Sequence, residues 1–202
     1  MNVIAAAESL IVTGDWLAAR RVLETGLLAT PKDHWMRSRL GVTYYETGDY
    51  SMALVHTEQA LALAPNCPIV LWDHAGTLQQ LGKHALAVDI YRKLVRRQVG
   101  WLAKDLCIQS RALAKGLIAD SQLRLSRSLD VLGEKQEADD AFMKHLTMRG
   151  PGCYSLYSLD RFPRKGMVLR LWRQKKQKGL RAPAAMSNQA VLPTRAVSKE
   201  LQ

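Results

Sequence analysis

Cysteine is scarce in this sequence, and the few cysteines present stand too far apart to form the structures that cysteines usually build. Among 202 residues there are three, Cys67, Cys107 and Cys153, and none belongs to a CxxC pair. An odd number at such spacings favours neither a disulfide framework nor a zinc knuckle. Reduced thiols fit a cytosolic protein best, so we expect a cytoplasmic location.

Long apolar runs are missing too. No stretch approaches the roughly 18 apolar residues of a membrane-spanning helix. The first 13 residues are apolar, but they include Glu8 and lack both a basic start and a convincing cleavage site. This beginning is unlike that of a secretory signal peptide. We therefore predict neither membrane insertion nor secretion.

Recognisable catalytic and cofactor-binding motifs are absent as well. The sequence has no Walker loop, GxGxxG or GxSxG motif, and so lacks the familiar phosphate-binding loops and activated serines. The histidines form no HxxxH or HExxH pair, and no cysteine stands at ligand spacing from any of them: His34, His56, His74, His84 and His145. We expect a protein that is not an enzyme and that has no metal site and no cofactor.

What the sequence does contain is an internal repeat of 34 residues. Gly14, Gly48 and Gly82 superimpose at this constant shift, and four further sets of residues keep the same register. Five columns without gaps are hard to obtain by chance, which indicates a repeat architecture. The further columns are Ala7, Gly41 and Ala75; Ala19, Ala53 and Ala87; Trp16, Tyr50 and His84; and, more weakly, Pro31 and Pro65 with Val99.

Each column has a physical reason. The small residues allow two helices to approach closely, so that larger side chains interdigitate around the contact. The glycines stand between two helical patterns, where the residue after a helix often needs a positive φ. The prolines end the second helix of each pair. Each unit is thus a helix, a tight turn, a helix and a break, with first helices at 2–12, 34–46 and 68–80 and second helices at 16–29, 50–63 and 84–97.

The second copy is the clearest, and it resembles a known repeat. It reads Leu40-Gly41-x-x-Tyr44, then Gly48-Asp49-Tyr50, Ala53, Ala60 and Pro65. This pattern is similar to the tetratricopeptide repeat, W-x-x-L-G-x-x-Y followed by spaced A, F, A and P over 34 residues. The resemblance covers about residues 1–150. It implies an all-α protein, an α-solenoid of about four helix-turn-helix repeats.

Three residues depart from the family's pattern. Arg37 replaces the opening Trp, Thr57 replaces the Phe, and His74 stands where a core Leu is usual. Leu54, Leu61 and either Thr57 or Glu58 follow the helical spacing of one face, and we expect the stretch 56–59 to lie largely on the outward side. His74 is expected to be a buried, hydrogen-bonded histidine, and the alternative is a packing residue that responds to pH.

A fourth copy follows after an insertion. Its turn, at Leu132-Gly133-Glu134-Lys135, lies 51 residues past that of the third copy, an excess of 17 over one repeat. The excess falls at about 99–117. We predict an irregular loop that contains Trp101 and Cys107, then an elongated first helix from about Ser110 to Leu132. A separate extra helix is the alternative.

The formal charge of +11 is concentrated at one end of the chain. Residues 1–160 hold 18 Lys and Arg against 17 Asp and Glu, whereas residues 161–202 hold 11 basic residues against one Glu. The repeat domain is therefore placed at 1–153, with repeats near 1–33, 34–67, 68–98 and 110–150. The remainder, 154–202, is predicted to be a basic and largely disordered tail.

The resemblance to tetratricopeptide repeats implies that the protein binds other proteins. In that family the first helices line a concave face that takes peptides or partner helices. We expect an adaptor or co-chaperone-like scaffold with partner-binding residues on that face: Trp35, Ser38, Val42, Tyr45, Glu46, Trp72, Gln79, Gln80, Arg127 and Asp130. For Trp35 and Trp72, packing between repeats is the alternative. The family's clamp for chaperone C-termini is absent, because Ser38, Val42, Trp72 and Gly76 occupy its positions.

The basic tail suggests a second class of partner. Its charges could attract nucleic acid or an anionic membrane surface, with binding that weakens as salt rises. The residues concerned surround Trp172 and are Arg170, Arg173, Lys175, Lys176 and Lys178. The simpler interpretations are a solvated tail or a short helix that caps the last repeat, and these are favoured.

Overall fold

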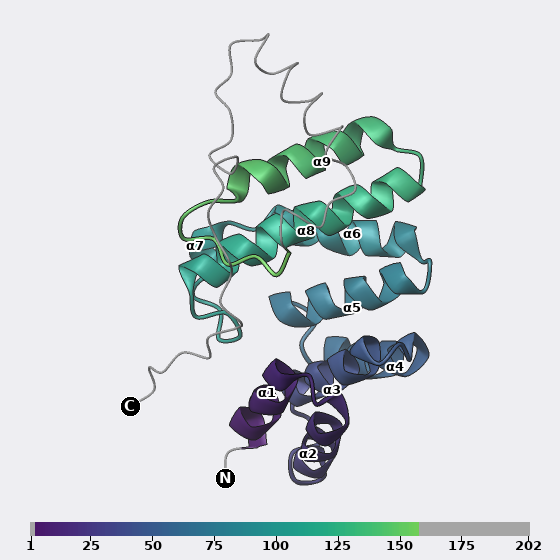
Figure 1. Cartoon of the computed structure of the whole chain (residues 1–202), viewed down its shortest axis with the longest axis vertical. Coiled ribbons are helices and arrows are strands. Elements are labelled where there is room, and N and C mark those ends of the chain that lie inside the picture. Colours follow the sequence, from purple (N-terminus) through teal and green to yellow (C-terminus); the bar gives the residue numbers. More distant parts are fainter. Residues whose placement is uncertain (1–2, 158–202) are drawn as a thin grey trace.

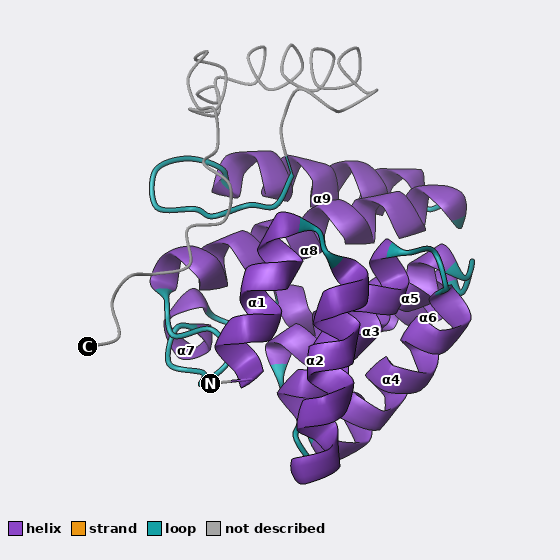
Figure 2. Cartoon of the chain, turned by 60° about the horizontal axis from the view of Figure 1, so that its bottom comes forward, coloured by secondary structure: helices purple, strands orange, loops and turns teal. Residues whose placement is uncertain are grey.

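The computed structural model describes residues 3–157, and within this range the chain consists of helices, turns and loops, with no strand (Figure 2). The predicted all-α fold is confirmed. The helices are α1 (Val3–Thr13), α2 (Trp16–Ala29), α3 (His34–Glu46), α4 (Tyr50–Leu63), α5 (Pro68–Gln80), α6 (His84–Val95), α7 (Val99–Leu102), α8 (Arg111–Val131) and α9 (Lys135–Met148).

The helices form packed pairs that stack in chain order along the long axis of the molecule (Figure 1). α1 packs on α2, α3 on α4, α5 on α6 and α8 on α9, and each pair also contacts the next through α2 and α3, α4 and α5, and α6 and α8. The six helices predicted from the first three repeats begin and end within two residues of the observed bounds. None of the helices within 3–157 is long and apolar enough to cross a membrane.

The turn inside each pair depends on glycine. Gly14, Gly48, Gly82 and Gly133 have φ values of 78°, 84°, 73° and 83°. This is the left-handed region, which a side chain disfavours. After two of these glycines an aspartate accepts a hydrogen bond from the third residue of the following helix and so caps it.

Small residues lie where the two helices of a pair cross. Ala53 and Ala75 are fully buried. Gly41 has no room for a side chain, because a Cβ there would lie 2.9 Å from Thr57 Cγ2. The close approach lets larger apolar side chains interdigitate. Their largest cluster lies between α5, α6, α8 and α9, around the fully buried Tyr91.

The insertion has its own small core. α8 is the elongated first helix of the fourth pair, as predicted, and Ser110 Oγ caps it by accepting from Leu113 N at 3.3 Å. The segment before it contains one short helix, α7, so the loop and extra-helix alternatives each hold in part. Leu102 and Ile108 from this segment are buried against α8. The insertion is therefore packed on the fourth repeat.

The departures from the family pattern have local explanations. Arg37 donates from Nε and Nη2 to Pro31 O, at 3.0 and 2.9 Å, and so ties α3 to the break between the first two repeats. The expected outward position of Thr57 is wrong. Its side chain is fully buried, and Oγ1 lies 3.1 Å from Nδ1 of His74, which is the buried, hydrogen-bonded histidine we expect.

The chain remains packed past the predicted domain boundary at residue 153. Tyr154 N donates to Ala112 O at 3.1 Å, and Ser155 is buried. The basic residues expected to bind nucleic acid or membranes lie outside the described residues.

Candidate functional site

The face that we call the first-helix face is the side of α3, α5 and α8 on which Tyr45, Trp72 and Arg124 lie. These helices follow one another in the stack (Figure 1). Tyr45 and Trp72, both predicted from the repeat register, are brought together by a residue that was not predicted. The Arg124 guanidinium carbon lies 4.1 Å from the Trp72 ring centroid and 5.9 Å from that of Tyr45. The cluster is therefore cation–π in character.

The position of Arg124 depends on a glycine in the neighbouring helix. A Cβ on Gly76 would lie 2.1 Å from Arg124 Nη1, so the guanidinium occupies the space that a side chain there would fill. On the other side, Gln79 Nε2 donates to Arg124 O at 3.1 Å and to Ser128 Oγ at 2.9 Å. Two residues of α5 thus fix α8 and hold the guanidinium against Trp72.

The segment Tyr154–Tyr157 covers the α8 end of the first-helix face. After α9 the chain returns across α8 (Figure 1). Tyr157 OH accepts a hydrogen bond from Arg124 Nε, and its ring lies 5.3 Å from the Arg127 guanidinium carbon. Burial raises the pKa of Tyr157, and it therefore contacts the cations as a neutral phenol. The chain's own aromatic residue thus completes the cluster.

Asp120 fixes the backbone of this segment. Its Oδ2 accepts from Leu156 N at 2.7 Å, and its Oδ1 accepts from Ser155 Oγ at 2.5 Å. Burial raises the pKa of Asp120, although both hydrogen bonds act in the opposite direction. One turn earlier on α8, Gly116 lets the segment approach, since a Cβ there would lie 1.5 Å from Tyr154 O. The segment is therefore held by backbone and side-chain contacts together.

Charged side chains link the first helices of the first three repeats. Arg39 Nε lies 2.9 Å from Glu8 Oε1, and Arg39 Nη1 lies 3.6 Å from Asp73 Oδ2. Ser38 Oγ donates to the same Asp73 oxygen at 2.8 Å. Ser38 is buried, so the structure corrects its predicted role: its hydroxyl joins two helices and does not lie at the surface.

The other predicted residues of the face differ in accessibility. Trp35 packs against the apolar cluster of the first two repeats, 5.3 Å from the Arg39 guanidinium carbon, and Trp72 packs against two clusters. Packing between repeats is thus a role of both tryptophans. Val42 and Gln79 are half-buried, while the exposed residues are Glu46, Gln80, Arg127 and Asp130. Gln80 Nε2 donates to Tyr45 OH at 3.1 Å.

Arg124 was not among the predicted site residues, although the repeat spacing contained a signal for it. Arg39 and Asp73 stand 34 residues apart, and Arg124 lies 51 residues further on, the spacing of the displaced fourth repeat. One repeat position thus carries a charged residue in three units. Asp120 and Tyr157 gave no such signal, because their pairing depends on how the chain leaves α9.

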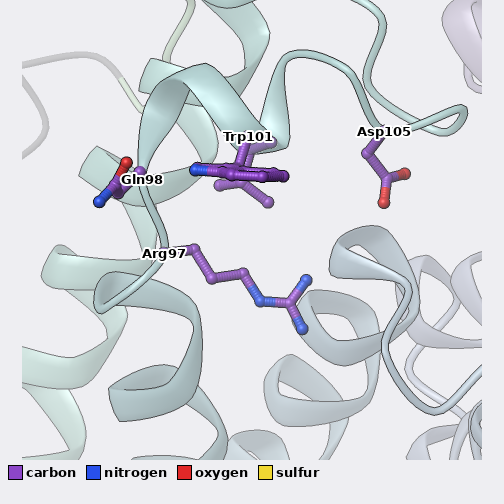
Figure 3. Close-up of a pocket in the computed structure, with 5 residues that line it drawn as sticks. Arg97, Gln98, Trp101 and Asp105 are labelled. Carbon is purple, nitrogen blue, oxygen red and sulfur yellow. The ribbon is translucent and has the colours of Figure 1, made fainter.

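A shallow pocket lies beside the insertion. Its volume is about 260 Å³, and Arg97, Gln98, Trp101, Leu102 and Asp105 line it (Figure 3). Arg97 Nη1 donates to Asn66 O at 2.8 Å, which ties the end of α6 to the loop before α5. Trp101 is 74% exposed.

Comparisons with known proteins concern the repeats. A family model of the tetratricopeptide repeat matches residues 37–67, which is the second copy. A crystal structure of MamA is 18% identical over 71% of this chain and 74% of that chain, with a TM-score of 0.54. MamA 41-end from Desulfovibrio magneticus RS-1 is 16% identical over 72% and 73%, with a TM-score of 0.55. At such identities the likeness concerns the fold alone. No curated protein matched the sequence.

Proposed function

We propose, from the premise that this chain is a tetratricopeptide repeat protein, that its first-helix face binds an extended segment of a partner protein. Proteins built from these repeats generally act as protein-protein interaction modules. The finer role is that of an adaptor or co-chaperone-like scaffold. Its groove would run along α3, α5 and α8, and specificity would come from Tyr45, Trp72 and Arg124.

The observation that carries the proposal is the set of contacts that the segment Tyr154–Tyr157 makes with α8. This segment uses the contacts by which a bound peptide would be held: a peptide N–H on Asp120, a carbonyl close to Gly116 and an aromatic ring on Arg124. Backbone contacts supply affinity in such a mode, and pockets for side chains supply specificity. The α8 end of the face is therefore able to hold an extended chain.

The remainder of the face has suitable anchors. Tyr45 and Trp72 are half-buried aromatic residues, a type that contributes strongly to binding energy at interfaces. Gln80, Arg127 and Glu46 are exposed around them, which provides a polar rim. We propose that a partner segment lies on α3 and α5 and meets, or displaces, the chain's own segment at α8.

The test uses a competing peptide. In a full-length Ser155→Ala, Tyr157→Ala variant the covering segment loses its side-chain contacts, while α8 is unchanged. A fluorescent peptide with the sequence of residues 151–159, Cys153 replaced by Ser, should bind this variant at least about tenfold more tightly than the wild type, because it no longer competes with the attached segment. Fluorescence anisotropy measures the affinity.

The control is the same peptide with Ala at the position of Tyr157, which should bind both proteins weakly. Equal affinity of the original peptide for the two proteins, or no binding to either, would count against the proposal. For natural partners, Tyr45→Ala should weaken capture. Leu86→Ala, which removes an exposed apolar side chain from the second helix α6, should leave it unchanged.

The alternative is association with nucleic acid or an anionic membrane surface through the basic tail, with the repeats as an assembly platform. The net charge of +10 over residues 161–202 favours it. Comparing the full-length protein with a chain ending at residue 160 separates the two functions. If the shortened chain captures nothing, and capture by the full-length protein falls steeply with salt, the tail and not the first-helix face is the binding site.

A further inference from the structure

Three side chains with metal-binding atoms converge at the edge of the second and third repeats. Cys107 Sγ, from the loop after α7, lies 3.3 Å from Cys67 Sγ and 3.6 Å from His34 Nε2. The three ligand atoms all lie within 4.8 Å of one another. They come from three places in the chain, and the sequence spacing between them gave no indication that they meet.

These distances fit the edges of a tetrahedral metal site. With Zn–S bonds of about 2.3 Å and a Zn–N bond of about 2.0 Å, a tetrahedral ion separates two sulfurs by about 3.8 Å and a sulfur from a nitrogen by about 3.5 Å. The observed separations of 3.3 and 3.6 Å differ from these values by no more than about half an ångström. The third pair, Cys67 Sγ and His34 Nε2, lies within 4.8 Å, and side-chain rotation would have to adjust this separation to about 3.5 Å around one ion.

Two opposing effects act on the thiols at this point. Cys67 is the N-cap residue of α5 and its side chain makes no capping hydrogen bond, while His34 is the first residue of α3. The site therefore lies at the N-terminal ends of two helices, where backbone dipoles stabilise negative charge. Without a metal, burial and the hydrogen bond from Cys67 raise the pKa of Cys107 to about 12, and a bound cation removes this opposition to ionisation.

We propose that His34, Cys67 and Cys107 bind a divalent metal ion of the zinc type. Binding releases the Sγ protons of the two cysteines to solvent, and the two thiolates and the neutral Nε2 lone pair bond the ion. Water fills the fourth position of the tetrahedron. Imidazole with two thiolates is a donor set that suits zinc, and three protein ligands with one open position is a known zinc arrangement.

A disulfide between Cys67 and Cys107 is the competing use of the same atoms. It would require the sulfurs to approach from 3.3 Å to about 2.0 Å. It would also require an oxidant, and it gives His34 no role. Convergence of the imidazole nitrogen on the sulfurs is the observation that favours the metal.

The proposed ion would fasten the insertion to the repeats that precede it. Cys107 belongs to the segment that carries Trp101 and Leu106, which are 74% and 85% exposed. Within that segment Asp105 Oδ1 accepts from Cys107 N at 2.9 Å, and Asp105 also lines the pocket of Figure 3. Metal binding would therefore fix one wall of the pocket relative to α3 and α5.

The experiment uses the reduced full-length protein with Zn²⁺ and Co²⁺ as probes. Native mass spectrometry should show one Zn²⁺ per chain, and the Co²⁺ form should show sulfur-to-cobalt charge-transfer absorption with the visible bands of a tetrahedral site. Cys67→Ser, Cys107→Ser and His34→Gln should each weaken Zn²⁺ binding by at least about 100-fold, beyond the 10- to 100-fold that loss of an outer partner causes. Cys153→Ser is the matched control and should bind as the wild type does.

A second measurement does not depend on variants. Zn²⁺ should protect Cys67 and Cys107 of the wild-type protein from alkylation, with Cys153 remaining reactive, as peptide mapping can determine. The proposal is overturned by absence of a bound ion in the reduced protein, by equal alkylation with and without Zn²⁺, or by variants that are folded by circular dichroism and bind Zn²⁺ like the wild type. A Cys67–Cys107 disulfide in protein isolated under reducing conditions would also overturn it.

Discussion

Thr57 Oγ1 and His74 Nδ1 lie 3.1 Å apart in the contact between the second and third repeats, and both side chains are buried. Thr57 Oγ1 also donates to Leu54 O at 3.1 Å, which leaves a lone pair to accept from Nδ1. We infer that Nδ1 carries the imidazole proton and donates it to Thr57 Oγ1, because the hydroxyl proton is already used on Leu54 O. Two departures from the repeat pattern, a Thr for a Phe and a His for a Leu, thus compensate for each other.

This pairing predicts that, in a double-mutant cycle, the Thr57 substitution destabilises the protein more than the His74 substitution does. Thr57→Val leaves the buried Nδ1–H of His74 without its acceptor and should lower the free energy of unfolding by about 1–3 kcal/mol. His74→Leu leaves Thr57 bonded to Leu54 O and should cost less than about 1.5 kcal/mol. The double variant should then lose less than the sum of the two. Urea unfolding of the four proteins measures the coupling, and strict additivity would mean that the hydrogen bond contributes nothing.

A second prediction concerns acid sensitivity and His145. This side chain is fully buried in α9, its Nδ1 lies 2.7 Å from Ala119 O, and burial lowers its pKa from 6.5 to about 4. His145 therefore binds a proton more readily in the unfolded chain than in the folded protein. The resulting stability is fully present above pH 6.5 and is lost as pH falls towards 4. The whole loss is roughly 3 kcal/mol, at about 1.4 kcal/mol per pKa unit.

The measurement compares urea midpoints at pH 7.5 and pH 5.0. His145→Gln keeps a donor for Ala119 O but cannot be protonated, so its stability should fall less between the two pH values than that of the wild type. Some decline should remain in both proteins, because burial also lowers the pKa of His56 and of His74. Identical declines would exclude His145 as the source.

The repeat register could be predicted from the sequence because each set of equivalent positions meets a local structural requirement. Gly48 must adopt a positive φ, and Gly41 must admit a neighbouring helix, so their spacing records the fold directly. Thr57 was misplaced because helical spacing admitted either Thr57 or Glu58 at the inner position of the helix. Its partner, His74, lies in the next repeat, and no pattern within one helix reveals a buried polar pair.

The candidate sites were only partly predictable, for a related reason. Tyr45 and Trp72 follow from the register of the first helices. Arg124 acquires its contacts from Gly76 in the preceding repeat and from Tyr157, which reaches it after the chain has left α9. His34 and the two cysteines meet because the insertion folds back on earlier repeats. Such contacts depend on tertiary packing between distant parts of the chain, and sequence spacing does not record them.

A third prediction concerns an ion pair that contributes little. Arg92 on α6 and Glu137 on α9 form a two-point contact, with Nε–Oε1 at 3.1 Å and Nη2–Oε2 at 2.7 Å. The pairing lowers the pKa of Glu137, but the side chains are 33% and 45% exposed. Solvent screens such pairs. Glu137→Gln should therefore change the urea midpoint by less than the equivalent of about 1 kcal/mol, and a larger effect would mean that the contact organises the last repeat.

The last prediction concerns the attachment of the segment Tyr154–Tyr157 to α8. Asp120→Ala removes the acceptor of the Leu156 amide, and a hydrogen bond to a charged group contributes about 1.5–3 kcal/mol. Exchange of that amide with deuterium should therefore accelerate by about tenfold to a hundredfold. The Tyr154 amide is an internal reference, because its acceptor is Ala112 O, which the substitution leaves in place.

Asp140→Ala is the matched control for this experiment. Asp140 is an exposed carboxylate on α9, so its removal causes the same change in net charge without touching the segment. Exchange at Leu156 should be the same in this variant as in the wild type. If Asp120→Ala leaves Leu156 protected, the aromatic contact of Tyr157 with Arg124 is sufficient to hold the segment. A partner would then have to displace that ring, and not the hydrogen bonds to Asp120, in order to reach α8.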